Sequence, residues 1–279
     1  MPFKTILVHL DESPNLDSRI ELAAQTAITH EAHLVGLAST GISRFFYDSV
    51  ASGAGVADLG PYLDNLRGQA NLRLQNFEKL ADRLGVNSFE KVLADDETEN
   101  ALAMRARYSD LVIVGQYDPE GTIQSVYANL PEYVTLNGAA PVLVIPYTGS
   151  YPLVPQRVLI AWDGGQEATR AIRNALPLLQ AAKVVEVAIF NPQERPDVHG
   201  EEPGADIALF LARHGVTANV RQERPEIPVG EALLSLAADL QSDLLVMGCY
   251  GHSRFREVLL GGVSRTILDA ITLPVLMSH

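Results

Sequence analysis

The sequence repeats itself, and this repeat constrains the fold more than any other feature. SDLVIVGQY at 109–117 matches SDLLVMGCY at 242–250, and APVLVIP at 140–146 matches LPVLMSH at 273–279, both at an offset of 133 residues. KTILVHLDES at 4–13 matches QRVLIAWDGG at 156–165 at an offset of 152, which pairs Asp11 with Asp163. The chain is therefore expected to contain two copies of one unit, with about 19 additional residues in the first copy.

Each copy alternates short apolar runs with segments of helical periodicity. In the second copy we predict strands at 157–162, 184–190, 217–222, 243–248 and 273–278, and helices at 165–181, 204–214, 229–240 and 263–271. This alternation predicts an α/β fold with two tandem doubly wound domains, each a parallel sheet with helices on both faces. The predicted domains are 1–147 and 156–279, joined by the Pro- and Gly-containing linker 147–156.

The additional residues of the first copy are concentrated after its second predicted strand, 33–40. They include GISRFFYDSVASGAGVADLG at 41–60, which we expect to fold across the vacant crevice beyond the strand ends of the first copy or to bind a partner. The helix that follows is also longer than its counterpart. Its predicted apolar stripe consists of Leu63, Leu66, Ala70, Leu74, Phe77, Leu80 and Leu84.

Composition excludes several classes of function. The net charge of −13 argues against non-specific nucleic-acid binding, which depends on clustered Lys and Arg. No run approaches the ~18 apolar residues of a membrane helix, and the first residues enter a strand directly, so we expect neither an anchor nor a signal peptide. A single cysteine, Cys249, excludes an intrachain disulfide. These observations favour a cytoplasmic protein with no membrane association.

Residues 248–264, GCYGHSRFREVLLGGVS, follow a predicted buried strand and combine several features of a phosphate site. Gly248 and Gly251 allow the backbone to approach a ligand closely. Gly261 and Gly262 precede an amphipathic segment, so they are expected to open a helix whose free N–H groups attract an anion. The alternative is that these glycines only form turns.

The pattern Gly248-x2-Gly251-x9-Gly261 resembles the nucleotide-binding motif of the universal stress protein family. The resemblance implies five parallel strands per domain in the order 3-2-1-4-5, and a nucleotide between the first and fourth strands. In this chain a hydroxyl residue expected after the third glycine is replaced by Gly262, for which Ser264 could substitute. Asp163 is then expected to bond the ribose or adenine, although it could instead cap the next helix.

The resemblance thus implies a site for ATP or a related adenine nucleotide, with or without Mg²⁺. Its expected residues are Ala161, Asp163, Ile189, Gly248, Gly251, His252, Ser253, Arg254, Gly261, Gly262, Val263 and Ser264. No metal ligands of the protein itself and no catalytic residues are expected. Arg254 is expected to contact phosphate, whereas Arg256 could equally pair with a surface carboxylate.

Aligning this motif with the first copy predicts that the first copy has a degenerate site. At the offset of 133 residues, Gly248 corresponds to Gly115, but Gly251 corresponds to Asp118. The remaining positions fall on Ala128, Asn129 and Pro131. Asp118 would repel a phosphate, and Pro131 has no N–H to offer an anion.

Two classes of function remain open at the level of sequence. The first is a stress-response protein that binds a nucleotide, hydrolyses it slowly at most, and signals to an unknown protein partner. The second is a dimeric scaffold of the same fold that binds no nucleotide. In the family the final strands pair domains, so we expect the two copies to form an intrachain pseudo-dimer and the chain to form a homodimer.

Overall fold

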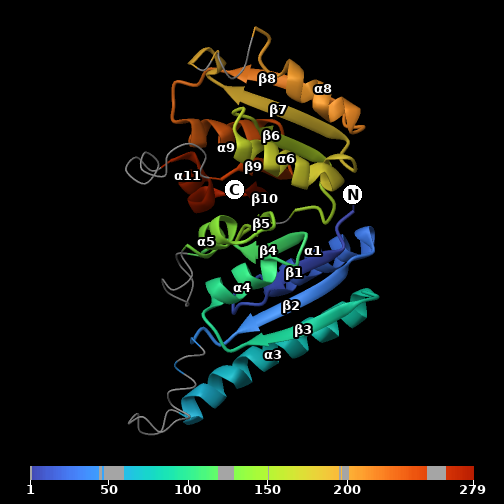
Figure 1. Cartoon of the computed structure of the whole chain (residues 1–279), viewed down its shortest axis with the longest axis vertical. Helices are drawn as coiled ribbons and strands as arrows, with labels where there is room; N and C mark the ends of the chain where they lie inside the picture. Colours follow the sequence, from blue (N-terminus) through green and yellow to red (C-terminus); the bar gives the residue numbers. More distant parts are fainter. Residues whose placement is uncertain are drawn as a thin grey trace. The chain divides into compact units, whose positions relative to one another are not determined.

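A computed structural model describes residues 2–43, 46, 60–118, 129–149, 151–194, 196, 201–249 and 262–279. The contacts within the chain divide it into two units, Pro2–Ala140 and Pro141–His279, here called the first and the second unit (Figure 1). Most of the 41–60 segment, and the loop that carries Gly251, His252, Ser253, Arg254, Arg256 and Gly261, lie outside the described residues.

The first unit contains four parallel strands and four described helices. In chain order these are β1 (Thr5–His9), α1 (Leu16–His30), β2 (His33–Ser39), α3 (Gly60–Leu84), β3 (Phe89–Ala94), α4 (Thr98–Ala106), β4 (Leu111–Gly115) and α5 (Leu130–Asn137). The strand order is β3-β2-β1-β4, with Leu7 level with Val35 on one side and with Val112 on the other. This is the predicted order for the first four strands of the repeat.

The second unit contains the complete predicted order. Its elements are β5 (Val142–Ile145), β6 (Arg157–Ala161), α6 (Gln166–Leu179), β7 (Val184–Phe190), η1 (Pro192–Glu194), α8 (Ala205–Arg213), β8 (Ala218–Glu223), α9 (Val229–Asp239), β9 (Leu244–Gly248), α11 (Val263–Ala270) and β10 (Val275–Ser278). The parallel strands run β8-β7-β6-β9-β10, which is 3-2-1-4-5 in order of sequence, so the predicted fold class is confirmed.

Strand β5 is the last strand of the first repeat, but its contacts place it with the second unit. It pairs antiparallel with β10, and Leu143 lies opposite Leu276. The predicted pairing of the final strands is therefore confirmed. Because each strand covers the edge of the other, neither of these apolar edges is left open.

The strands form because their apolar residues can be buried on both faces of each sheet. Ile6, Leu7 and Val8 of β1 are fully buried, as expected for a central parallel strand. On β2, Gly36 lies against Phe77 of α3, whereas the Ser39 hydroxyl contacts the hydroxyl of Thr98 at the start of α4. Positions 36 and 39 lie on opposite faces of the strand, so helices cover both faces of this sheet.

The predicted difference between the two second helices is also confirmed. Helix α3 has 25 residues and its counterpart α8 has 9. Leu63, Ala70, Leu74, Phe77 and Leu80 form a buried stripe on α3. Leu84 does not continue the stripe, because it is the last residue of the helix and is exposed. No described helix is long and apolar enough to cross a membrane.

Candidate functional site

The first component of the candidate site is the turn after β6. The strand ends at Ala161, and the chain then passes through Trp162, Asp163 and Gly164 before Gly165 caps helix α6. Gly164 has φ = +73°, a left-handed conformation that glycine adopts without strain. The exposed Asp163 accepts a hydrogen bond of 2.8 Å from the Gly165 N–H through Oδ1. The predicted capping role of Asp163 therefore takes the form of a turn that precedes the helix.

The second component is the end of β9, the strand that lies next to β6. Ile160 is level with Val246, so Trp162 and Gly248 follow at the same edge of the sheet. A Cβ atom at Gly248 would lie 2.6 Å from the backbone nitrogen of Ala168. The glycine therefore lets helix α6 approach the end of β9, a packing role that the sequence interpretation did not include.

The third component is the start of α11. Gly262 is its N-cap residue, and Val263 and Ser264 form the first turn, with Ser264 buried at 2% exposure. The Arg265 and Thr266 N–H groups bond back to the Gly262 carbonyl, at 3.0 and 3.1 Å. The aligned peptide dipoles give the N-terminal end of a helix a partial positive charge, which favours an anion there.

Two further predicted site residues lie in strands of the second unit. Ala161 is the partly exposed last residue of β6. Ile189 of β7 is fully buried, and its Cδ1 lies against Gly204, which has φ = +91°. The Ile189 side chain therefore belongs to the core, and a ligand could reach only its backbone. The roles of both residues in binding remain predictions.

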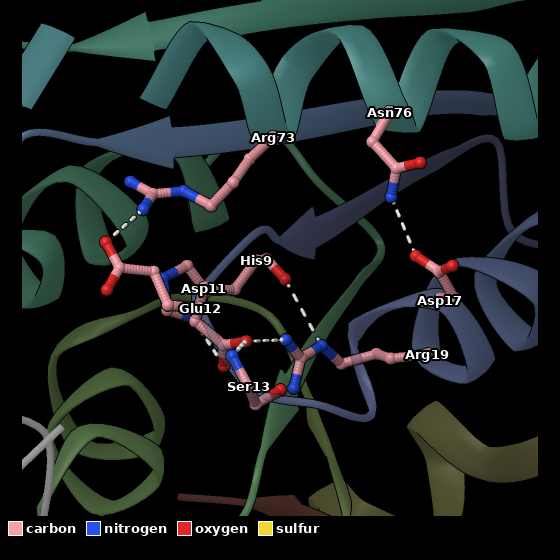
Figure 2. Close-up of polar contacts among 8 residues, drawn as sticks. All are labelled: His9, Asp11, Glu12, Ser13, Asp17, Arg19, Arg73 and Asn76. Carbon is pink, nitrogen blue, oxygen red and sulfur yellow. Dashed lines mark hydrogen bonds and ion pairs between the residues drawn. The ribbon is translucent and has the colours of Figure 1, made fainter. Parts of the chain in front are cut away.

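The equivalent edge of the first unit is occupied by its own side chains (Figure 2). Arg19, on the first turns of α1, is only 3% exposed and forms an ion pair with Asp11. Its Nε donates to the His9 carbonyl at 3.2 Å. A Cβ at Gly115 would overlap with Nη1 of Arg19, so the guanidinium lies directly on the end of β4. We call His9, Asp11, Arg19 and Gly115 the Arg19 cluster.

Burial and charge strongly shift the ionisation of the Arg19 cluster. Burial alone raises the pKa of Asp11, but the charge of Arg19 and hydrogen bonds from Ser13 and Arg19 outweigh it and hold the pKa well below its usual range. Burial lowers the pKa of His9 from 6.5 to about 4, against the smaller effect of the Asp11 carboxylate. Asp11 is therefore ionised and His9 neutral at pH 7.

A second arginine extends this polar region toward α3. Arg73 lies with its Nη1 2.5 Å from Glu12 Oε1, and its Nη2 donates to the Ser39 carbonyl at 3.0 Å. Figure 2 shows Arg73 reaching down from α3 toward Glu12, while Asn76 of the same helix bonds Asp17 at 2.7 Å. These contacts join the turn after β1 to the end of β2 and to α3.

The repeat reveals what differs between the two edges. At the offset of 152 residues, Arg19 corresponds to Ala171 and His9 to Ala161. Ala171 is fully buried in α6, and its methyl group cannot extend to Asp163 as Arg19 extends to Asp11. Sequence analysis did not single out Arg19, although the same offset that paired Asp11 with Asp163 pairs Arg19 with Ala171 and so marks a difference between the two copies.

The other predicted substitutions in the first unit fall where α5 begins. Asn129 is the N-cap residue of α5 and makes no side-chain capping bond, and Pro131 lies buried in the first turn. Pro131 supplies no N–H at the position where α11 has Ser264. Ala128 lies outside the described residues. Among the residues that are described, no group of three or more His, Cys, Asp or Glu could hold a metal ion.

Sequence comparison matches residues 155–279 to the Universal stress protein family. No curated protein matches the chain. Among solved structures, a universal stress protein from Archaeoglobus fulgidus is similar over 98% of this chain and 95% of its own, with 16% identity and a TM-score of 0.74. A functionally unknown protein from Pseudomonas aeruginosa is similar over 99% and 92%, respectively, with 16% identity and a TM-score of 0.62. At these identities the structural similarity concerns the fold.

Proposed function

Because residues 155–279 match the Universal stress protein family, we propose that this half of the chain binds an adenine nucleotide at the carboxyl edge of β6 and β9. In a doubly wound sheet, ligands bind beyond the strand ends where neighbouring crossovers diverge, and the first and fourth strands of the unit flank that point. Asp163 lies two residues after the first of these strands, and Gly248 is the last residue of the fourth.

The observation that carries this proposal is the exchange of Arg19 for Ala171. In the first unit, the arginine covers the end of β4 and neutralises Asp11, so a ligand would have to displace a buried ion pair. In the second unit, an alanine stands at that position and Asp163 is exposed. The first unit is accordingly proposed to have no nucleotide site of its own.

The proposed site residues are assigned the following roles in nucleotide binding. The Asp163 carboxylate accepts hydrogen bonds from the ribose or the adenine amino group. The first turn of α11, from Val263, and the Ser264 hydroxyl act on the phosphates, together with the Gly251 to Gly261 segment and Arg254. ATP is the proposed ligand, with Mg²⁺ held by its phosphates. We propose binding with slow hydrolysis at most, and a protein partner that responds to the bound state.

The chain contains a single tryptophan, Trp162, which is adjacent to Asp163 and can report binding in the second unit. We expect ATP to change its fluorescence and to release heat in titration calorimetry. Asp163→Ala should weaken binding ~10-fold or more, because it removes a charged hydrogen-bond acceptor. The matched control Asp11→Ala should bind as the wild type does. If Asp11→Ala abolished binding and Asp163→Ala did not, the site would be in the first unit.

Native mass spectrometry of the freshly purified chain separates the nucleotide proposal from the scaffold alternative. An added mass of ATP, ADP or AMP would support the nucleotide site. No added mass, together with no heat on titration of ATP, ADP, AMP or cyclic AMP, would favour a scaffold that binds no nucleotide. Release of inorganic phosphate from bound ATP at a rate typical of enzymes, ~1 s⁻¹ or more, would contradict slow hydrolysis.

A further inference from the structure

The outermost strand of the first unit, β3, lies beside a groove lined by both apolar and charged side chains. Within the described residues β3 pairs only with β2, so its other edge is free of strand partners (Figure 1). The groove has a volume of about 690 Å³, and its floor includes Leu37, Val92 and Ala101. Its wall carries Met104 and Tyr108, which are 52% and 78% exposed.

In the second unit, charged side chains cover the equivalent position of the edge strand β8. Leu37 is level with Val92 on β3, and the corresponding Ala188 of β7 is level with Arg221 on β8. Arg221 Nε bonds Glu186 Oε2 at 3.0 Å, and the Asn219 amide bonds Glu186 Oε1 at 3.0 Å. Charged side chains over an edge strand discourage pairing with another chain. The first unit has valine where the second has this arginine.

We propose that β3 pairs antiparallel with β3 of a second copy of the chain, with Val92 of the two copies on the two-fold axis. The backbone geometry permits this register. The Ser88 and Ala94 carbonyls point toward β2, since they accept from Leu34 and Thr40. Direction alternates along a strand, so residues 91 and 93 point their N–H and C=O groups outward. In the proposed register, residue 91 of each copy lies opposite residue 93 of the other.

Charge complementarity supports a second copy as the occupant. In this register Glu90 lies opposite Ala94 of the second copy, and Asp96 comes two residues beyond Ala94. Arg105 Nη1 is 4.0 Å from Glu90 Oε1 of the same copy, so Arg105 lies at the level of Glu90 along the strand. Arg105 and Asp96 both line the groove, whereas Asp95 is already held by Arg67 at 2.6 Å. Arg105 of each copy therefore faces Asp96 of the other copy, and the two-fold axis produces two such pairs.

The apolar contact lies between these two charge pairs. Val92 of both copies would meet at the centre, where antiparallel side chains are closest, and Met104 and Tyr108 of each copy would cover them. A centre that excludes water with charged groups around it is the usual arrangement of a specific interface. The dimer does not depend on nucleotide binding.

The first test is the oligomeric state of the full chain. Light scattering and sedimentation should show a dimer at concentrations of ~10–100 μM, a range in which modest interfaces are populated. Val92→Arg, which introduces the residue of the second unit, should weaken the dimer ~100-fold or more, because it places two arginines on the axis. The control Gln222→Arg, on the exposed edge strand β8, should remain dimeric. A monomeric wild type, or a dimer that tolerates Val92→Arg, would overturn the proposal.

The second test uses two surface variants that leave the core intact. Arg105→Asp and Asp96→Arg should each be mainly monomeric, because each sets like charges opposite one another across the axis. An equimolar mixture of the two should recover the dimer, since every pair is then of opposite charge, and only a contact between copies can produce this recovery. Mixtures that stay as monomeric as their components would refute the register.

Discussion

The first unit fills the edge between its first and fourth strands with a buried arginine, and the second unit has an alanine at that position. Both edges are built on the same strand order and both carry an aspartate after the first strand. Asp11 forms a buried ion pair with Arg19, whereas Asp163 is exposed and accepts a hydrogen bond from the N–H of Gly165. Equivalent aspartates of a repeated fold can therefore be buried in an ion pair in one copy and exposed at the surface in the other.

The outer edges of the two sheets differ in the opposite direction. In the second unit the Arg221–Glu186 pair lies over β8, whereas in the first unit Val92 stands at the position of Arg221 and a groove lies beside β3. The two units therefore differ at both of these edges of their sheets.

The largest expected effect comes from breaking the Arg19 cluster. Arg19→Ala leaves the Asp11 carboxylate in a buried position without its counter-ion, which should lower the free energy of unfolding by ~3–5 kcal/mol. Urea unfolding followed by far-UV circular dichroism measures the loss. The control is Arg170→Ala on α6, whose side chain is exposed and bonds Gln166, and it should cost less than ~0.5 kcal/mol. Equal losses in the two variants would contradict the role given to Arg19.

The next effect is a dependence of stability on pH that originates in the first unit. Burial lowers the pKa of folded His9 from 6.5 to about 4, so between these values the unfolded chain binds a proton that the folded chain does not. Stability should therefore fall as the pH decreases from 6.5 to about 4, by about 3 kcal/mol from this residue alone.

Urea unfolding at several pH values tests this for the wild type and for His9→Gln. The variant cannot titrate in this range, so its stability should vary less between pH 6.5 and 4. The second unit has Ala161 at the equivalent position and should contribute no such dependence. Parallel pH profiles for the two proteins would show that His9 does not determine the slope.

The fold was predictable because its signals are regular along the sequence. The repeat offsets and the alternation of apolar runs predicted the five parallel strands of the second unit, β6 to β10, to within two residues. The assignment of β5 to the second unit was not predictable from periodicity, because pairing of the final strands depends on contacts distant in sequence.

The candidate site was predictable only in part. The turn at Asp163, the strand end at Gly248 and the helix start at Gly262 were predictable because turns and helix starts have local signatures, whereas the part of these residues in binding stays a prediction. Arg19 was overlooked because an arginine on an amphipathic helix usually reaches solvent, and only the tertiary packing shows that it turns inward to Asp11. The packing of α6 on Gly248 was overlooked for the same reason, since a glycine after a strand has several uses.

Alanine substitutions at the two glycines that end the fourth strands, Gly115 and Gly248, should differ moderately in their cost in stability. Gly248→Ala would bring a Cβ to 2.6 Å from the backbone nitrogen of Ala168, which cannot move without shifting α6. Gly115→Ala would instead meet Nη1 of Arg19, at the far end of a flexible side chain, which can shift while it keeps its ion pair with Asp11. We expect Gly248→Ala to cost ~1–3 kcal/mol and Gly115→Ala to cost less. Thermal unfolding of both variants decides the order, and the reverse order would mean that the Arg19 guanidinium is held more rigidly than the helix.

The smallest expected effect concerns Glu12, whose position in the second unit is taken by Gly164. The Glu12 side chain is 50% exposed and pairs with Arg73, and exposed ion pairs contribute at most ~1 kcal/mol. Arg73 also bonds the Ser39 carbonyl at 3.0 Å, so it remains anchored after Glu12→Gln. The variant should lose less than ~1 kcal/mol at low salt, and its difference from the wild type should disappear near 1 M salt because screening then removes the attraction. A loss that persists at high salt would mean that Glu12 supports the Arg19 cluster through its packing, and the first edge would then be a larger cooperative unit than its ion pairs suggest.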